Sequence, residues 1–146
     1  MTPLPSQLHP AVARSLDAWH DMIARRDLGE LESIVHPDAV FRSPMAINAY
    51  RPRPALLLAL NTVITIFEDF SYHRQLASAD GLSVVLEFSA RVDGKQIKGI
   101  DLIRFDEAGL IVDFEVMVRP LNGLQELGAR MGAKLGHALP AFKFKA

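Results

Sequence analysis

The chain contains no cysteine, which excludes disulfide bonds, thiol nucleophiles and cysteine-ligated metal sites. It has no excess of either charge, with a formal net charge of -1, and its Lys and Arg residues are scattered, so the basic patch of a nucleic-acid-binding protein is missing. No charge-free apolar run approaches the length of a membrane span, and no basic segment followed by an apolar run opens the sequence. We therefore expect a soluble, cytoplasmic protein without nucleic-acid or membrane partners.

The histidines also lack the spacing of a metal site. There are five, and no two stand four residues apart on one helix: His9, His20, His36, His73 and His137. We expect no metal and no cofactor.

What the chain does have is enough apolar sequence for one core. Its 146 residues are 49% hydrophobic, which favours a single domain over residues 1–146 with its core at about 8–136. Apolar residues at three- and four-residue spacing predict an amphipathic helix from Leu8 to Arg26. Asp27 is expected to cap a second, short helix that continues to Val35 and ends at His36-Pro37-Asp38.

The middle of the chain predicts a short strand and a buried helix. Residues Ala39–Ser43 form a partly alternating run that Pro44 ends, as in an edge strand. Pro54 fits the first turn of a helix that carries a wide apolar face as far as Phe67.

The second half changes to a period of two, which predicts four long antiparallel strands in succession. Asp80-Gly81, Asp93-Gly94 and Glu107-Ala108-Gly109 mark the turns between them. Pro120 opens a last amphipathic helix, in which Gly128, Gly132 and Gly136 recur every four residues and favour close packing against the sheet. Phe142 and Phe144 in the tail fit a docked strand, a cover over an apolar opening, or disorder.

Asp101 interrupts an apolar strand, Gly-Ile-Asp-Leu-Ile-Arg-Phe. If its side chain points inward, burial raises the pKa of the carboxyl group and makes it a candidate acid, base or hydrogen-bond donor. If it points outward, it is a solvated charge or the partner of an arginine. The residues around it leave both interpretations open.

Two segments carry a resemblance to a known superfamily. Residues 27–44, from Asp-Leu-Gly-Glu-Leu to Phe-Arg-Ser-Pro, and residues 99–112, Gly-Ile-Asp-Leu-Ile-Arg-Phe-Asp-Glu-Ala-Gly-Leu-Ile-Val, resemble the nuclear transport factor 2-like superfamily in its SnoaL-like and ketosteroid-isomerase-like branch. The resemblance implies an α+β fold, a cone-shaped, curved antiparallel sheet wrapped by N-terminal helices and followed by a C-terminal helix, as in a cystatin-like α+β barrel. It also implies a homodimer formed through the outer face of the sheet.

Ketosteroid isomerases combine an aspartate base with an oxyanion hole made of a tyrosine and a protonated aspartate. Matched motif to motif, Asp101 stands at the aspartate of that hole, and Ser43 stands where the base would be. Serine cannot accept a proton near neutral pH as a carboxylate can, which argues against steroid isomerisation. Trp19 stands in place of the tyrosine and offers one N–H donor.

We thus expect a pocket for a small apolar molecule that contains a carbonyl group. Asp101 and Trp19 are the candidate catalytic residues, for chemistry of the isomerase or cyclase type. The candidate ligand-binding residues are Ser43, Tyr50, Tyr72, His20, Phe41, Phe88, Phe114, Val116 and Val118. The alternatives are a cone filled by these side chains, or a dimeric binding or scaffolding module that has lost the chemistry.

Overall fold

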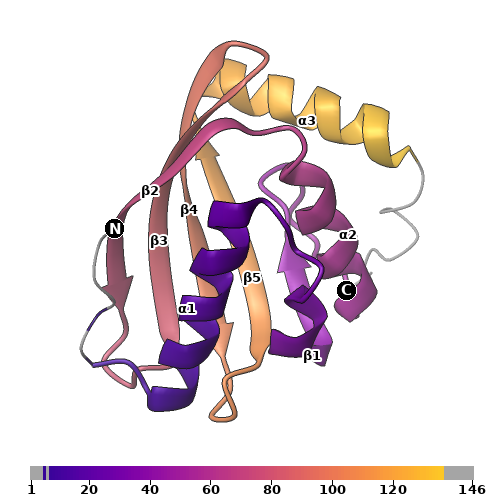
Figure 1. Ribbon diagram of the computed structural model, residues 1–146. Coiled ribbons are helices and arrows are strands. Elements are labelled where there is room, and N and C mark those ends of the chain that lie inside the picture. Colours follow the sequence, from indigo (N-terminus) through magenta and orange to yellow (C-terminus); the bar gives the residue numbers. More distant parts are fainter. Residues whose placement is uncertain (1–4, 6, 137–146) are drawn as a thin grey trace.

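The computed structural model describes residue 5 and residues 7–136. In chain order the elements are α1 (Pro10–Arg25), the 3-10 helix η1 (Leu31–Ile34), β1 (Val35–Arg42), α2 (Arg53–Val63), β2 (Glu68–Ala77), β3 (Ser83–Val92), β4 (Lys95–Phe105), β5 (Ile111–Arg119) and α3 (Leu121–Leu135). The strands form one curved sheet; α1 lies in front of it, α2 lies beside β1, and α3 crosses the end of the sheet (Figure 1). The α+β fold expected from the sequence is confirmed.

The sheet has the order β1-β5-β4-β3-β2. The strands β2 to β5 are antiparallel neighbours, as the period of two predicts, and β1 adds to the edge parallel to β5. Leu86 pairs with Asp101, and Asp101 pairs with Val116. Directly opposed residues share a face, so Asp101 stands among apolar neighbours on the face that α1 covers.

The region after α1 differs from the sequence-based expectation. Asp27 does not cap a helix; its carboxylate accepts a hydrogen bond from the Gly29 N–H at 2.9 Å, and the helical segment is a single 3-10 stretch. β1 already begins at Val35 and includes His36-Pro37-Asp38, which we expected to end a helix. Short apolar runs suit a strand as well as a helix, and pairing with β5 decided the outcome here.

The helix α2 ends at Val63, four residues before the predicted end at Phe67. Its apolar face packs on β1 and is buried at Ala55, Leu56, Ala59 and Leu60. The segment 64–67 then leaves the helix and connects to β2, and this places Ile64 and Phe67 beside the cavity described below.

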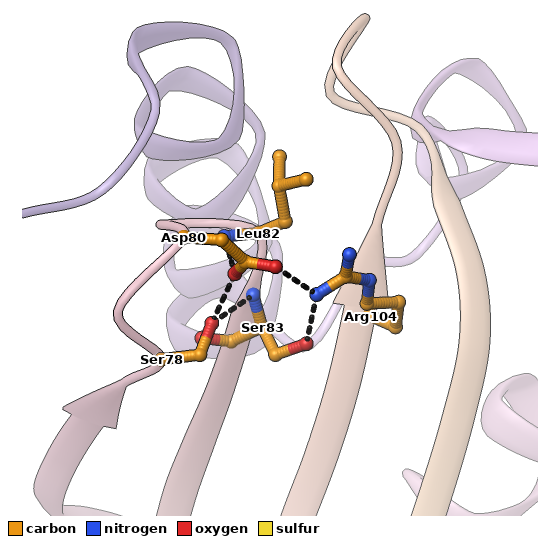
Figure 2. A network of polar contacts seen from close by, with 5 residues as sticks. All are labelled: Ser78, Asp80, Leu82, Ser83 and Arg104. Atoms are coloured by element: carbon orange, nitrogen blue, oxygen red, sulfur yellow. Dashed lines mark hydrogen bonds and ion pairs between the residues drawn. The ribbon is translucent and has the colours of Figure 1, made fainter.

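The predicted turn at Asp80-Gly81 joins β2 to β3. The Asp80 carboxylate accepts hydrogen bonds from Ser78 Oγ at 2.6 Å, from the Leu82 N–H at 3.0 Å and from Arg104 at 2.8 Å (Figure 2). These donors, Ser78 first, lower the pKa of Asp80 to about 2. Gly81 has a φ of +72°, and a Cβ there would lie 2.6 Å from the Gln7 carbonyl oxygen, so the turn and the start of α1 fit together only without a side chain.

Candidate functional site

A pocket of about 230 Å³ lies between the sheet and the helices α1, α2 and α3. Its wall is mostly apolar, with Phe41, Leu60, Phe67 and Phe114 among the lining residues. Such a wall with a few polar groups is typical of sites for small organic molecules.

At the polar end of the pocket, three side chains are linked in series by hydrogen bonds. Trp19 Nε1–H donates to the Tyr72 hydroxyl at 3.0 Å, and the Tyr72 hydroxyl donates to Asp101 Oδ2 at 2.5 Å. They come from α1, β2 and β4, and all three line the pocket. Within the described residues, no hydrogen bond reaches the second carboxyl oxygen, Oδ1, so the arrangement leaves this atom for a ligand.

Burial determines the protonation states of Asp101 and Tyr72. Asp101 is 6% exposed, and desolvation raises the pKa of its carboxyl group to about 7, while the hydrogen bond from Tyr72 opposes the rise. Burial, and next the neighbouring carboxylate, hold the pKa of Tyr72 well above 10.0. At neutral pH, therefore, Tyr72 keeps its proton and Asp101 exists in both its acid and its base form.

Most of the predicted ligand-binding side chains line the pocket: Phe41, Ser43, Tyr50, Tyr72, Phe114 and Val116. Phe88 and Val118 do not. Phe88 is fully buried behind Phe67 and Phe70, with ring centroids 5.6 Å and 5.1 Å away, and Val118 packs against the same cluster. The sequence placed both on the inner face of the sheet, but other side chains cover that part of it.

His20 was expected at the pocket and lies behind it instead. Its Nε2 is 2.7 Å from Gln75 Oε1, and its ring meets the Tyr72 ring edge-on with centroids 5.1 Å apart. Burial lowers the pKa of His20, although Gln75 and Asp17 oppose the shift. His20 thus supports Tyr72 from outside the pocket.

Ser43 and Tyr50 are the other predicted polar groups. Ser43 Oγ accepts a hydrogen bond from the Met45 N–H at 3.0 Å, so the side chain stabilises the loop after β1. Tyr50 is held by main-chain hydrogen bonds with Phe41, and its hydroxyl makes no hydrogen bond within the described residues. Across the same part of the chain, no group of three His, Asp or Glu side chains could hold a metal ion.

The structure adds lining residues that the sequence did not predict. Arg26 follows α1, Gly128 and Gly132 lie on α3, and Gly136 directly follows α3. All four line the pocket, so the glycines do not pack on the sheet as expected. A Cβ at Gly128 would lie 2.5 Å from Met45 Cε, whereas a Cβ at Gly132 would meet nothing within 4 Å in the described region. The four-residue spacing signalled one helix face but could not tell which surface that face meets. Phe142 and Phe144 lie outside the described residues.

The comparisons with known proteins agree with this fold. The family model described as a SnoaL-like domain matches residues 16–114. A solved structure described as a steroid delta-isomerase from Pseudomonas aeruginosa is 61% identical, with a TM-score of 0.89, over 94% of this chain and 99% of that chain. No curated protein matches the chain.

Two more solved structures are less similar. An uncharacterised protein with a cystatin-like fold from Silicibacter pomeroyi is 28% identical, with a TM-score of 0.79, over 92% of each chain. The epoxide hydrolase/cyclase-like enzyme SalBIII, which has a role in pyran ring formation in the polyether salinomycin, is 15% identical, with a TM-score of 0.62, over 75% of this chain and 91% of that chain. The last likeness concerns the fold alone. Among the described residues, no helix is long and apolar enough to cross a membrane.

Proposed function

This chain belongs to the SnoaL-like domain family, and on that premise we propose that its pocket binds a small apolar molecule with a carbonyl group and acts on it by isomerase-type acid–base chemistry. The observation that carries the proposal is Asp101, a buried carboxyl group with one oxygen left for a ligand inside an apolar pocket.

Asp101 is the acid in this proposal. Tyr72 already donates to Oδ2, so the proton of neutral Asp101 is carried on Oδ1. From there it is donated to the carbonyl oxygen of the ligand and stabilises the negative charge that develops when a proton leaves the neighbouring carbon. The Trp19 N–H does not donate to the ligand in this arrangement; it donates to the Tyr72 hydroxyl, and successive donations strengthen one another.

The proton acceptor is the missing part. No second carboxylate and no imidazole line the pocket in the described part of the chain. The resemblance to ketosteroid isomerases would place Ser43, which is not a carboxylate, at the position of the base. Water would have to take the carbon-bound proton. This observation favours the second candidate, a binding protein without catalysis.

Two substitutions at Asp101 separate these candidates. Asp101→Asn keeps an N–H donor but cannot titrate, whereas Asp101→Leu removes the donor. With a β,γ-unsaturated steroid ketone, chosen because the 61% identical relative is described as a steroid delta-isomerase, formation of the conjugated ketone is followed by ultraviolet absorption. We expect Asp101→Asn to lower kcat by about a hundredfold or more and Asp101→Leu to weaken ketone binding by roughly tenfold.

Each result has a clear meaning. Equal turnover by Asp101→Asn and the wild type contradicts the role of Asp101 as an acid. Binding without turnover by the wild type, with weaker binding by Asp101→Leu, supports the binding protein.

We also propose that the outer sheet face pairs two copies of the chain. An apolar row crosses this face at Leu76, Val85 and Leu102, and Ile100 and Met117 lie beside it. Leu76 and Met117 are 59% and 44% exposed, and a contiguous exposed apolar patch marks an interaction surface. Glu87 forms ion pairs with both Arg74 and Lys98 on the same face, so these three side chains keep a net charge of only +1.

Replacing Leu102 by Lys is expected to convert a dimer into a monomer in sedimentation velocity experiments, because a charge would be buried without a partner. Ile47→Lys is the matched control, since Ile47 is 95% exposed in a loop. A wild-type chain that sediments as a monomer at high concentration would refute the proposal.

A further inference from the structure

Arg26 lines the pocket, and Lys134 contacts the same segment as Arg26, residues 64–67, whose Ile64 and Phe67 also line it. The Arg26 guanidinium donates to the carbonyl oxygens of Ile64 and Phe67, the latter at 3.2 Å. Lys134 Nζ on α3 donates to Thr65 Oγ1 at 2.8 Å. Arg26, Lys134 and the segment 64–67 together form a cationic rim. Arg26, Ile64 and Phe67 all line the pocket.

Neither cation is paired with an acidic side chain of the described residues. Within the described residues, Arg26 and Lys134 form no ion pair, although several other cations do, such as Arg25 with Asp21 and Arg91 with Asp69. The residues outside the described part contain no Asp or Glu, so no acidic side chain there could pair with them. The cationic rim therefore adds two positive charges to the edge of an apolar cavity.

Among the described residues, nothing fills the space over Gly132 and Gly136 at the pocket. Gly132 of α3 and Gly136, which directly follows this helix, line the pocket and are exposed. An added Cβ at either position would have nothing within 4 Å among the described residues. Alanine is more favourable than glycine inside a helix by up to about 1 kcal/mol, and no contact of the described chain requires glycine at position 132. The missing side chain leaves room for a ligand to pass over α3.

We infer that the ligand is an anionic amphiphile, with a carboxylate or sulfonate at the cationic rim, an apolar body in the pocket and, at the other end, the carbonyl group. This inference deepens the proposed function and rests on it for the carbonyl end only. Cations at the edge of an apolar cavity attract an anion, and the apolar wall selects the body attached to it.

The first experiment tests the cationic rim alone, with two fluorescent probes that differ in one charged group. Anilinonaphthalene sulfonate carries the anion, and N-phenylnaphthylamine has the same rings without it. The ratio of the affinity for anilinonaphthalene sulfonate to the affinity for N-phenylnaphthylamine is measured for the wild type, Arg26→Gln, Lys134→Gln and the double variant. Because both cations are partly solvated, we expect the ratio to fall about threefold with each substitution and about tenfold with both at low salt. Added salt should lower the wild-type ratio.

The controls separate charge from folding. Arg26→Lys and Lys134→Arg should keep most of the wild-type ratio, and Arg14→Gln, on an exposed turn of α1, should leave it unchanged. Unchanged binding of the neutral amine by each variant shows that the pocket is intact. An unchanged ratio in the double variant would overturn the inference.

The second experiment connects the two ends of the ligand. A keto bile acid and its methyl ester are compared on the same proteins and on Asp101→Leu. We expect the wild type to bind the acid more tightly than the ester and the double variant to lose that preference. Asp101→Leu should weaken binding of the acid and of the ester by the same factor. If the double variant loses the preference for the acid but Asp101→Leu binds both ligands as the wild type does, the cationic rim is supported and the proposed function is refuted. If the double variant keeps the preference for the acid but Asp101→Leu binds both ligands more weakly, the cationic rim is refuted and the proposed function is supported.

Discussion

Asp101→Asn is expected to make the folded protein more stable than the wild type at pH 8, with a difference in the free energy of unfolding on the order of 4 kcal/mol. The reason is the pKa of Asp101, about 7 in the folded protein against a model value of 3.8. Above pH 7 the wild type must hold a buried carboxylate, whereas asparagine is neutral and can still accept the hydrogen bond from Tyr72.

The sign of the pH dependence follows from proton binding. Between pH 4 and pH 7 the unfolded chain has lost the Asp101 proton while the folded chain keeps it, so the wild type loses stability as the pH rises through this range. Below pH 4 both states are protonated and the penalty is absent. The advantage of Asp101→Asn should therefore be small at pH 4, grow towards pH 7 and then stay constant.

Urea unfolding of both proteins at several pH values measures this directly. The matched control is Asp38→Asn, an exposed carboxylate whose side chain has no hydrogen bond or ion pair within the described residues. The difference in the free energy of unfolding between Asp38→Asn and the wild type should not show the rise with pH that is expected for Asp101→Asn. A constant difference for Asp101→Asn from pH 4 to pH 8 would show that Asp101 is not held neutral by burial.

The sequence predicted the sheet because its strands follow from local alternation, but it left open whether Asp101 points inward or outward. A period of two assigns each residue of β3 to β5 to one face, and the structure places Asp101 on the inner face between Leu86 and Val116. The helix expected after Asp27 failed because a short apolar run is ambiguous, and only contact with β5 selects the strand.

The partners of Asp101 were harder to predict. Trp19 was expected to donate beside Asp101, but Tyr72 stands between them. The pairing of β2 with β3 shifts register between Tyr72 and Gln75, and nothing in the alternation of β2 reveals this irregularity. The cationic rim was also missed, because Arg26, Thr65 and Lys134 come from three distant segments that only the fold brings together.

Tyr72→Phe is expected to raise the pKa of Asp101 further above its ordinary value. The hydrogen bond from Tyr72 is the interaction that lowers this pKa, and phenylalanine removes it while leaving the burial. The substitution also takes the acceptor from Trp19 Nε1–H, and Trp19 is 2% exposed. A buried group without its partner costs about 1–3 kcal/mol, so Tyr72→Phe should destabilise the fold by roughly that amount.

Two measurements check this expectation: the pH titration of the Asp101 carboxyl carbon by NMR, and the pH dependence of ketone binding. If neutral Asp101 is the donor to the ligand, binding by the wild type should fall as the pH rises through about 7, and binding by Tyr72→Phe should fall at a higher pH.

Tyr50→Phe is the matched control, because Tyr50 lines the same pocket and its hydroxyl makes no hydrogen bond within the described residues. It should leave the titration of Asp101 where it is in the wild type. If Tyr72→Phe also leaves that titration unchanged, Tyr72 does not lower the pKa of Asp101. The hydrogen bonds from Trp19 through Tyr72 to Asp101 then serve packing alone. If Tyr72→Phe shifts the titration but not the pH dependence of binding, Tyr72 tunes the carboxyl group but neutral Asp101 is not what holds the ligand.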